Sequence, residues 1–244
     1  LQLGLMLFLL AAGLTLVFGI MDMVNLAHGS LYMVGAYLIA TVSAAADSFW
    51  VGLGVGVLAT AVLGMLLEVT VLRRLYSRDH VTQVLGTFAI LLTCNEGVRM
   101  VWGSQPISLN PPAALAGPVE LLPGFYYPAF RLLIIGVGLA TALVLYLLVT
   151  RTRMGMQVRA GASNRDMALA MGTNVQRLFT AVFGLGAALC ALAGGMLGPL
   201  LAVQVGMGES ILILAFVVIV IGGIGSIRGA LVGALLVGLV DSGG

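Results

Sequence analysis

The sequence predicts an all-α integral membrane protein with about eight transmembrane helices. Its residues are 61% hydrophobic and only 8% charged, whereas an ordinary globular domain is about 25% charged. Apolar stretches close to the roughly 20 residues that a helix needs to cross a bilayer recur along the whole chain. These stretches are continuously apolar and do not alternate with polar residues, which argues against a transmembrane β-barrel.

Eight apolar stretches are expected to form the membrane spans. In order, they are Leu1–Met21, Met23–Ala46, Ser48–Leu67, Val81–Trp102, Leu132–Thr150, Leu178–Gly208 and Ser210–Ile227, with Gly229–Val240 beginning an eighth. The sequence starts inside the first stretch and stops just after the last, so we expect one transmembrane domain, residues 1–244, truncated at both ends. Glycine is 34 of the 244 residues, and such small residues allow membrane helices to approach closely.

Every basic residue is an arginine, because the sequence contains no lysine. A phosphate-binding loop of the G-x-x-x-x-G-K-[ST] type needs its lysine, and a lysine Schiff base is equally excluded. If ATP drives this protein, a separate polypeptide therefore binds the nucleotide. Cys94 and Cys190 lie in separate apolar stretches without a Cys/His cluster, so neither a disulfide nor a metal site is expected.

The distribution of arginine predicts the orientation. Three arginines lie in residues 73–80 and five in residues 151–177, whereas residues 103–130 carry six of the seven prolines and no basic residue. Because arginine-rich loops mark the cytoplasmic side, we expect the first two segments to be cytoplasmic and the third to be external.

A polar interruption separates the first two apolar stretches. It contains Asp22, Asn25 and His28, followed at once by Gly29 and Ser30. Polar groups at membrane depth are tolerated where they face protein or a water-lined path, and transporters build substrate sites from such broken helices. Asn25–Ser30 is therefore predicted to be an irregular turn beside the translocation path, the alternative being an interfacial turn with His28 bonded locally.

A glycine-rich segment, Ile221–Gly233, breaks the apolar sequence again near the other end. Two interrupted segments in the two halves of the chain suggest an internal repeat, although a short cytoplasmic hairpin would explain the second one equally well. Asn95 and Glu96 are further candidates for the pathway. Arg99 lies three residues after Glu96, so a structural ion pair on the helix surface is the alternative for that acid.

Residues 151–177 form a polar, arginine-rich segment between two apolar stretches, and they are predicted to contain a cytoplasmic coupling helix. Ser163 and Asp166 match the S-x-x-[DE] capping box, and Gly172 is a natural helix stop. A helix over Ser163–Met171 would display an apolar patch of Met167, Ala168, Ala170 and Met171 to a partner protein; the alternative is a helix lying flat on anionic lipid. The predicted coupling residues are Ser163, Arg165, Asp166, Met167, Ala168, Met171 and Gly172.

These motifs resemble those of branched-chain amino acid ABC transporter permeases of the LivH type. The resemblance spans the whole chain and rests on Gly13-Leu-Thr-Leu-Val-Phe-Gly19, Val24-Asn-Leu-Ala-His-Gly29, Gly35-Ala-Tyr37, Asn95-Glu96, Arg159-Ala-Gly161 through Gly172, and Gly222-Gly-Ile-Gly-Ser226 with Gly229-Ala230. It implies a multi-pass permease domain in the bacterial inner membrane, paired with a second permease subunit. It also implies two cytoplasmic ATPase subunits, which bind the ATP, and an external solute-binding protein.

The resemblance implies a cargo of branched-chain or other apolar amino acids, with urea or short amides as the alternative. An ATP-independent secondary transporter or channel is the alternative from another class, and only Asp22 and Glu96 could serve it as coupling acids. No catalytic base–nucleophile set is present, so we do not expect an enzyme. We expect no cofactor in this chain and no nucleic-acid partner; membrane lipid is the surrounding solvent.

Overall fold

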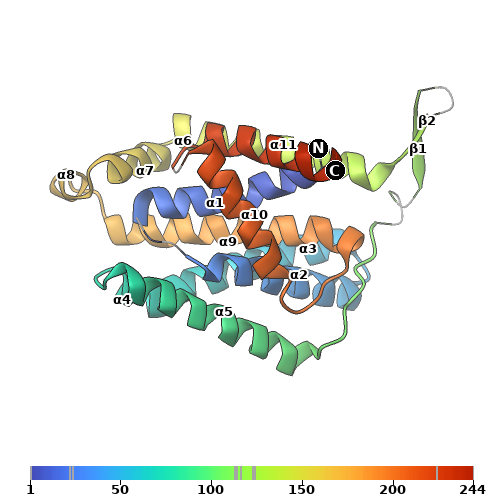
Figure 1. Ribbon diagram of the computed structural model, residues 1–244, viewed down its shortest axis with the longest axis horizontal. Helices are drawn as coiled ribbons and strands as arrows, with labels where there is room; N and C mark the ends of the chain where they lie inside the picture. The colour runs from blue at the N-terminus through green and yellow to red at the C-terminus, as the bar shows by residue number, and fades with distance from the viewer. Residues whose placement is uncertain are drawn as a thin grey trace.

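A computed structural model describes residues 2–21, 23, 25–112, 115, 117–122, 125–223 and 225–243 (Figure 1). The elements are α1 (Gln2–Met21), α2 (Ala27–Ala46), α3 (Phe49–Leu67), the π-helical turn η1 (Glu68–Leu72), α4 (Arg73–Leu75), α5 (His80–Trp102), β1 (Pro118–Leu122), β2 (Phe125–Pro128), α6 (Ala129–Arg151), α7 (Arg153–Ser163), α8 (Arg165–Ala170), α9 (Val175–Leu201), α10 (Met207–Gly222) and α11 (Ile227–Gly243). The all-α membrane fold is confirmed. Only a small antiparallel hairpin, β1–β2, adds sheet to the described residues.

The expected number of eight spans was too high. Within the described residues, six helices are long and apolar enough to cross a membrane, or seven if α10 and α11 together make one span. These two helices have 16 and 17 residues and are bent by 120° at the break between them. The glycine-rich composition predicted this break correctly. α10 ends at Gly222, and the next two described residues, Gly223 and Gly225, both adopt positive φ angles.

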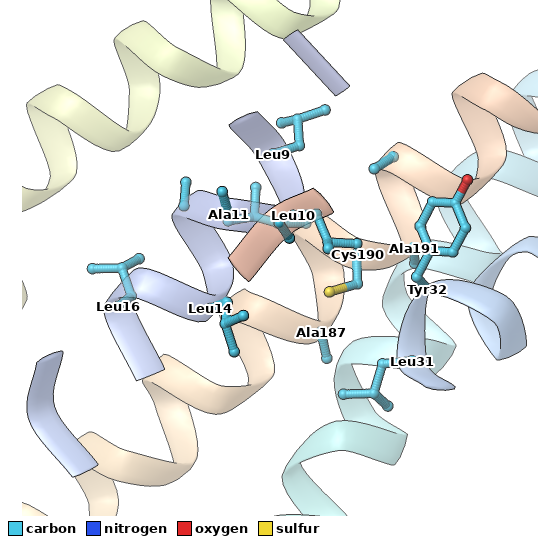
Figure 2. Packing of buried hydrophobic residues seen from close by; sticks show 14 of the residues in the cluster. Leu9, Leu10, Ala11, Leu14, Leu16, Leu31, Tyr32, Ala187, Cys190 and Ala191 are labelled. Atoms are coloured by element: carbon cyan, nitrogen blue, oxygen red, sulfur yellow. The ribbon is translucent and has the colours of Figure 1, made fainter. Parts of the chain in front are cut away.

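α1 and α9 form the centre of the molecule. In an apolar stretch of 18 residues from each helix, 83% of the residues are buried in α1 and 72% in α9. The same share is only 17% in α5 and in α6, which lie at the periphery. Figure 2 shows Leu10 and Leu14 of α1 beside Ala187 and Cys190 of α9. The two helices run antiparallel, because α1 ends and α9 begins at the end of the molecule that carries α7 and α8 (Figure 1). Peripheral apolar side chains face outward, as lipid-facing helices require.

The arginine-rich segments group at one end of the molecule. The turn after α4 and the pair α7–α8 are at one end of the molecule, and the β1–β2 hairpin is at the other (Figure 1). Asp79 begins α5 at the arginine-bearing end. Its carboxylate accepts hydrogen bonds from Thr82 Oγ1 at 2.6 Å and Thr82 N at 3.1 Å, and these bonds lower the pKa of the Asp79 carboxyl.

Labelling from the two sides of the membrane tests the orientation. Ser108 and Ser163 are both exposed; Ser108 lies in the segment that joins α5 to the β1–β2 hairpin, and Ser163 is the last residue of α7. We expect an impermeant maleimide added outside to label a Ser108→Cys variant and to leave a Ser163→Cys variant unlabelled until the membrane is opened. Labelling of both variants from the same side would contradict the orientation.

Candidate functional site

The break between α1 and α2 is shorter than the predicted turn over Asn25–Ser30, and it begins earlier, because α1 ends at Met21. α2 starts at Ala27, so His28, Gly29 and Ser30 are already helical, and the prediction of an irregular turn over Asn25–Ser30 was wrong in its extent. Asn25 explains the early start, because its Oδ1 accepts a hydrogen bond from Ala27 N at 3.0 Å, which satisfies one free amide of the first helical turn. Asp22 lies outside the described residues.

His28 occupies a slot between two glycines in the core. A Cβ atom added at Gly13 would lie 2.9 Å from His28 Nε2, and one added at Gly186 would lie 3.0 Å from Cε1 of the same ring. The ring is fully buried, and it makes an edge contact with Phe183 at a centroid distance of 6.4 Å. Neither ring nitrogen has a hydrogen-bond partner among the described residues. Because Gly13 and Gly186 lie near the middle of α1 and α9, the imidazole is held deep in the membrane domain.

A further break, between α9 and α10, lies close to the start of α2. α9 ends at Leu201 and α10 begins at Met207, so the expected span Leu178–Gly208 is interrupted in its last residues. A Cβ atom at Gly208 would lie 2.1 Å from the carbonyl oxygen of Gly29, which places the starts of α10 and α2 in backbone contact. Each break thus joins a long central helix to a helix that turns back. α1 and α9 themselves pack against each other in antiparallel directions (Figure 1).

Asn95 and Glu96 lie on α5. Asn95 Nδ2 donates to Glu209 Oε1 at 2.6 Å and so links α5 to the first turn of α10. Glu96 accepts from Arg99 at 3.1 Å, and both side chains are 56% exposed. The structure therefore does not bring Glu96 together with Asn25 and His28, and the ion pair on the helix surface accounts for it.

The arginine-rich segment, residues 151–177, contains two helices, α7 and α8, instead of one. Ser163 is the last residue of α7, and Asn164 caps α8 by accepting from Met167 N at 2.9 Å. The prediction that Ser163 caps the helix was therefore wrong by one residue. Asn164 takes this position because its backbone is extended, with φ −155° and ψ 104°. Gly172 has the positive φ, +82°, that the predicted stop requires.

The apolar patch on α8 also differs from the prediction. Ala168 is only 4% exposed, so it packs within its own chain and is not available to a partner. Met167, Leu169 and Met171 are 61%, 49% and 80% exposed. Arg165 and Asp166 belong to the first turn of α8, but their side chains lie outside the description. The exposed apolar surface of α8 and its C-cap is therefore Met167, Leu169, Ala170 and Met171.

A buried carboxylate that the sequence did not mark as important joins two helices at the arginine-bearing end of the molecule. This residue, Glu68, is fully buried at the start of η1. Its Oε2 accepts from Arg73 Nη2 at 3.1 Å and from the Thr180 hydroxyl at 2.6 Å, and its Oε1 accepts from the Tyr76 hydroxyl at 3.2 Å. These bonds connect η1 and α4 to α9. The only signal in the sequence was the spacing from Glu68 to Arg73.

The sequence profile described as the permease component of branched-chain amino acid transport systems matches residues 1–244. The chain belongs to this family. Its members are transport components and not enzymes. Among the described residues, no group of three or more His, Cys, Asp or Glu side chains could hold a metal ion.

Curated relatives agree with the family. The chain is 29% identical to the high-affinity branched-chain amino acid transport system permease protein LivH of Escherichia coli, over 96% of this chain and 80% of LivH. It is 30% identical to BraD of Pseudomonas aeruginosa, a permease protein of the same description, with the same two coverages. A probable LivH of Methanocaldococcus jannaschii is 29% identical over 97% of this chain and 76% of its own length. No solved structure gave a significant match.

Glu68 and Glu96 make a matched pair for a stability test. Glu68→Ala would leave Arg73 and Thr180 without their shared buried acceptor, and a hydrogen bond to a charged group contributes about 1.5–3 kcal/mol. Glu96→Ala removes an exposed pair, which is worth about 0–1 kcal/mol. We expect thermal unfolding of the purified protein in detergent to show a large decrease in melting temperature for Glu68→Ala and a negligible decrease for Glu96→Ala. Equal losses would contradict a structural role for the Glu68 cluster.

Proposed function

We propose that the chain is the membrane subunit of an ABC importer that carries branched-chain amino acids across the bacterial inner membrane. The observation that supports this function most strongly is the family match over the entire chain. The printed names of LivH and BraD supply the class of cargo. The same comparisons favour an ABC importer over an ATP-independent transporter or a urea permease.

The partner subunits are inferred from the absence of lysine in this sequence and from the apolar side chains that α8 exposes. Its sequence has no lysine for a phosphate-binding loop, so two separate ATPase subunits supply the energy. A second permease subunit completes the pathway, and an external solute-binding protein delivers the cargo.

The end of the molecule that carries α7 and α8 is the docking site for the ATPase. Three apolar side chains, Met167, Leu169 and Met171, project there from one short helix. Methionine side chains adapt to irregular grooves on partner proteins. Because α8 leads through Thr173 and Asn174 directly into α9, a displacement of α8 would reach the central helix of the permease.

His28 and Asn25 belong to the moving part of this mechanism. A buried imidazole without a hydrogen bond is less favourable than an apolar side chain of similar size. Its presence in the slot between Gly13 and Gly186 therefore favours a role in transport, in which a shift of α1 against α9 would give the ring a polar partner.

Reconstitution of the assembled importer tests the proposed function. With permease, ATPases and binding protein in proteoliposomes, we expect labelled leucine to enter only when ATP is present on the ATPase side. Absence of leucine uptake by a complete and folded assembly would contradict the proposal.

Substitutions on α8 test the docking site in the same assembly. Met171→Asp places a charge in the apolar contact, and loss of a central interface side chain costs about 2 kcal/mol or more. We expect the ATPase to dissociate during purification and leucine uptake to fall about 10-fold or more.

Gln157→Asp is the matched control, because Gln157 is exposed on α7 and the change adds the same charge. It should leave both ATPase binding and uptake unchanged. Ala168→Asp is not a clean test, since Ala168 is buried and the change would disturb α8 itself. Retention of the ATPase by the Met171→Asp variant would rule out docking through α8.

A further inference from the structure

A cavity of about 540 Å³ opens at the end of the molecule that carries α7 and α8. It lies between α1, α6, α7 and the break that joins α10 to α11, and it is separate from the exposed surface of α8. Its size is within the range of small-molecule sites, roughly 300–1,000 Å³. Most of its wall is apolar and includes Leu16, Ile20 and Val158.

The polar part of the cavity wall is positive. Arg159 and Arg228 both line it, and its described lining contains no aspartate or glutamate. Tyr146 positions Arg228, because the guanidinium carbon lies 5.2 Å from the centre of the Tyr146 ring and Nη2 donates to the Tyr146 hydroxyl at 3.1 Å. These two guanidinium groups favour an anion with a planar acceptor group.

The N-terminus of α11 adds to this positive character. Gly225, Ser226 and Ile227 line the cavity at the start of the helix. Ser226 Oγ accepts from Gly229 N at 3.1 Å and fixes this first turn. A helix N-terminus carries partial positive charge and free amide groups, so it reinforces the attraction of an anion.

Thr15 marks the other end of the cavity. It lines the wall from α1, is only 1% exposed, and its Oγ1 has no hydrogen-bond partner among the described residues. Thr15 lies two residues from Gly13, which contacts the His28 ring. The cavity therefore reaches from the arginines towards the level of His28.

We propose that this cavity is an inward-facing release site that holds the cargo by its carboxylate. The carboxylate would bind Arg228 and the N-terminus of α11, and the apolar side chain of the cargo would pack on Leu16, Ile20 and Val158. This inference rests on the proposed function and adds to it the chemical group that the permease itself recognises.

Protection of a cysteine in the cavity wall tests the site. Ala162 is exposed and lines the cavity, so an Ala162→Cys reporter is made in the full chain with Cys94→Ala and Cys190→Ala. The importer is assembled with its partners in phosphatidylcholine nanodiscs and labelled with a maleimide. We expect leucine and 4-methylpentanoate, which share the carboxylate, to slow labelling, and 3-methylbutylamine, which lacks it, to have no effect.

Arg228→Gln should weaken protection by leucine about 10-fold or more, because a charge-assisted bond is lost. Arg151→Gln is the matched control, since Arg151 is exposed at the same end but is outside the cavity wall. Equal protection by the amine and the acids would overturn the proposal, as would undiminished protection in a folded Arg228→Gln variant. If that variant does not assemble, the comparison of acids with the amine decides alone.

Two further outcomes separate this inference from its alternatives. Slow labelling in phosphatidylglycerol nanodiscs, with no added effect of leucine, would assign the cavity to an anionic lipid and overturn the proposal. Leucine uptake by the importer without any protection of the reporter would refute the release site while leaving the proposed function intact. A complete assembly that takes up no leucine at all would refute the proposed function itself.

Discussion

The packing of the core depends on how closely three helices approach one another around the His28 ring. In a bilayer, helices gain little from burying apolar surface against each other, so close packing and small residues hold them together. Gly13 and Gly186 supply the space for the ring on either side, and a Cβ at Gly35 would lie 2.5 Å from the Cβ of Ala191. α1, α2 and α9 could not keep their present separation if these glycines carried side chains. The contact between Gly29 and Gly208 then fixes α10 against the same core.

The same packing links the membrane core to the end of the molecule that carries α7 and α8. α9 continues directly from the segment that bears α8, and Glu68 ties η1 to α9 through Thr180. A force applied to α8 would therefore act on α9 and, through Glu68, on α3 and α4. α1 lines the cavity and also supplies Gly13, which contacts the His28 ring. The surface of α8, the buried imidazole and the cavity thus all adjoin the central helices α1 and α9.

The sequence predicted what composition and local charge decide, namely the all-α membrane fold, the grouping of the arginine-rich loops at one end, and the break at Gly222–Ser226. It failed where tertiary contacts decide. The capping box pattern fitted Ser163, but the path of the chain ends α7 there and lets Asn164 cap α8. Ala168 and Met171 are equally apolar in sequence, and only the fold separates the buried one from the exposed one. The break after Leu201 was hidden in an apolar stretch, and the burial of Glu68 depends on Thr180, which is far away in sequence.

A double-mutant cycle on His28 and Gly186 tests the core packing most directly. Alanine is a better helix former than glycine by about 1 kcal/mol, so Gly54→Ala, which meets no atom within 4 Å, should be neutral or stabilising in detergent melting experiments. Gly186→Ala should instead destabilise the protein by about 1–3 kcal/mol, because the His28 ring is held from the opposite side by Gly13 and cannot move away. In a His28→Ala background, the Gly186→Ala change should lose this cost. An unchanged cost in that background, or no cost in the parent protein, would contradict the account.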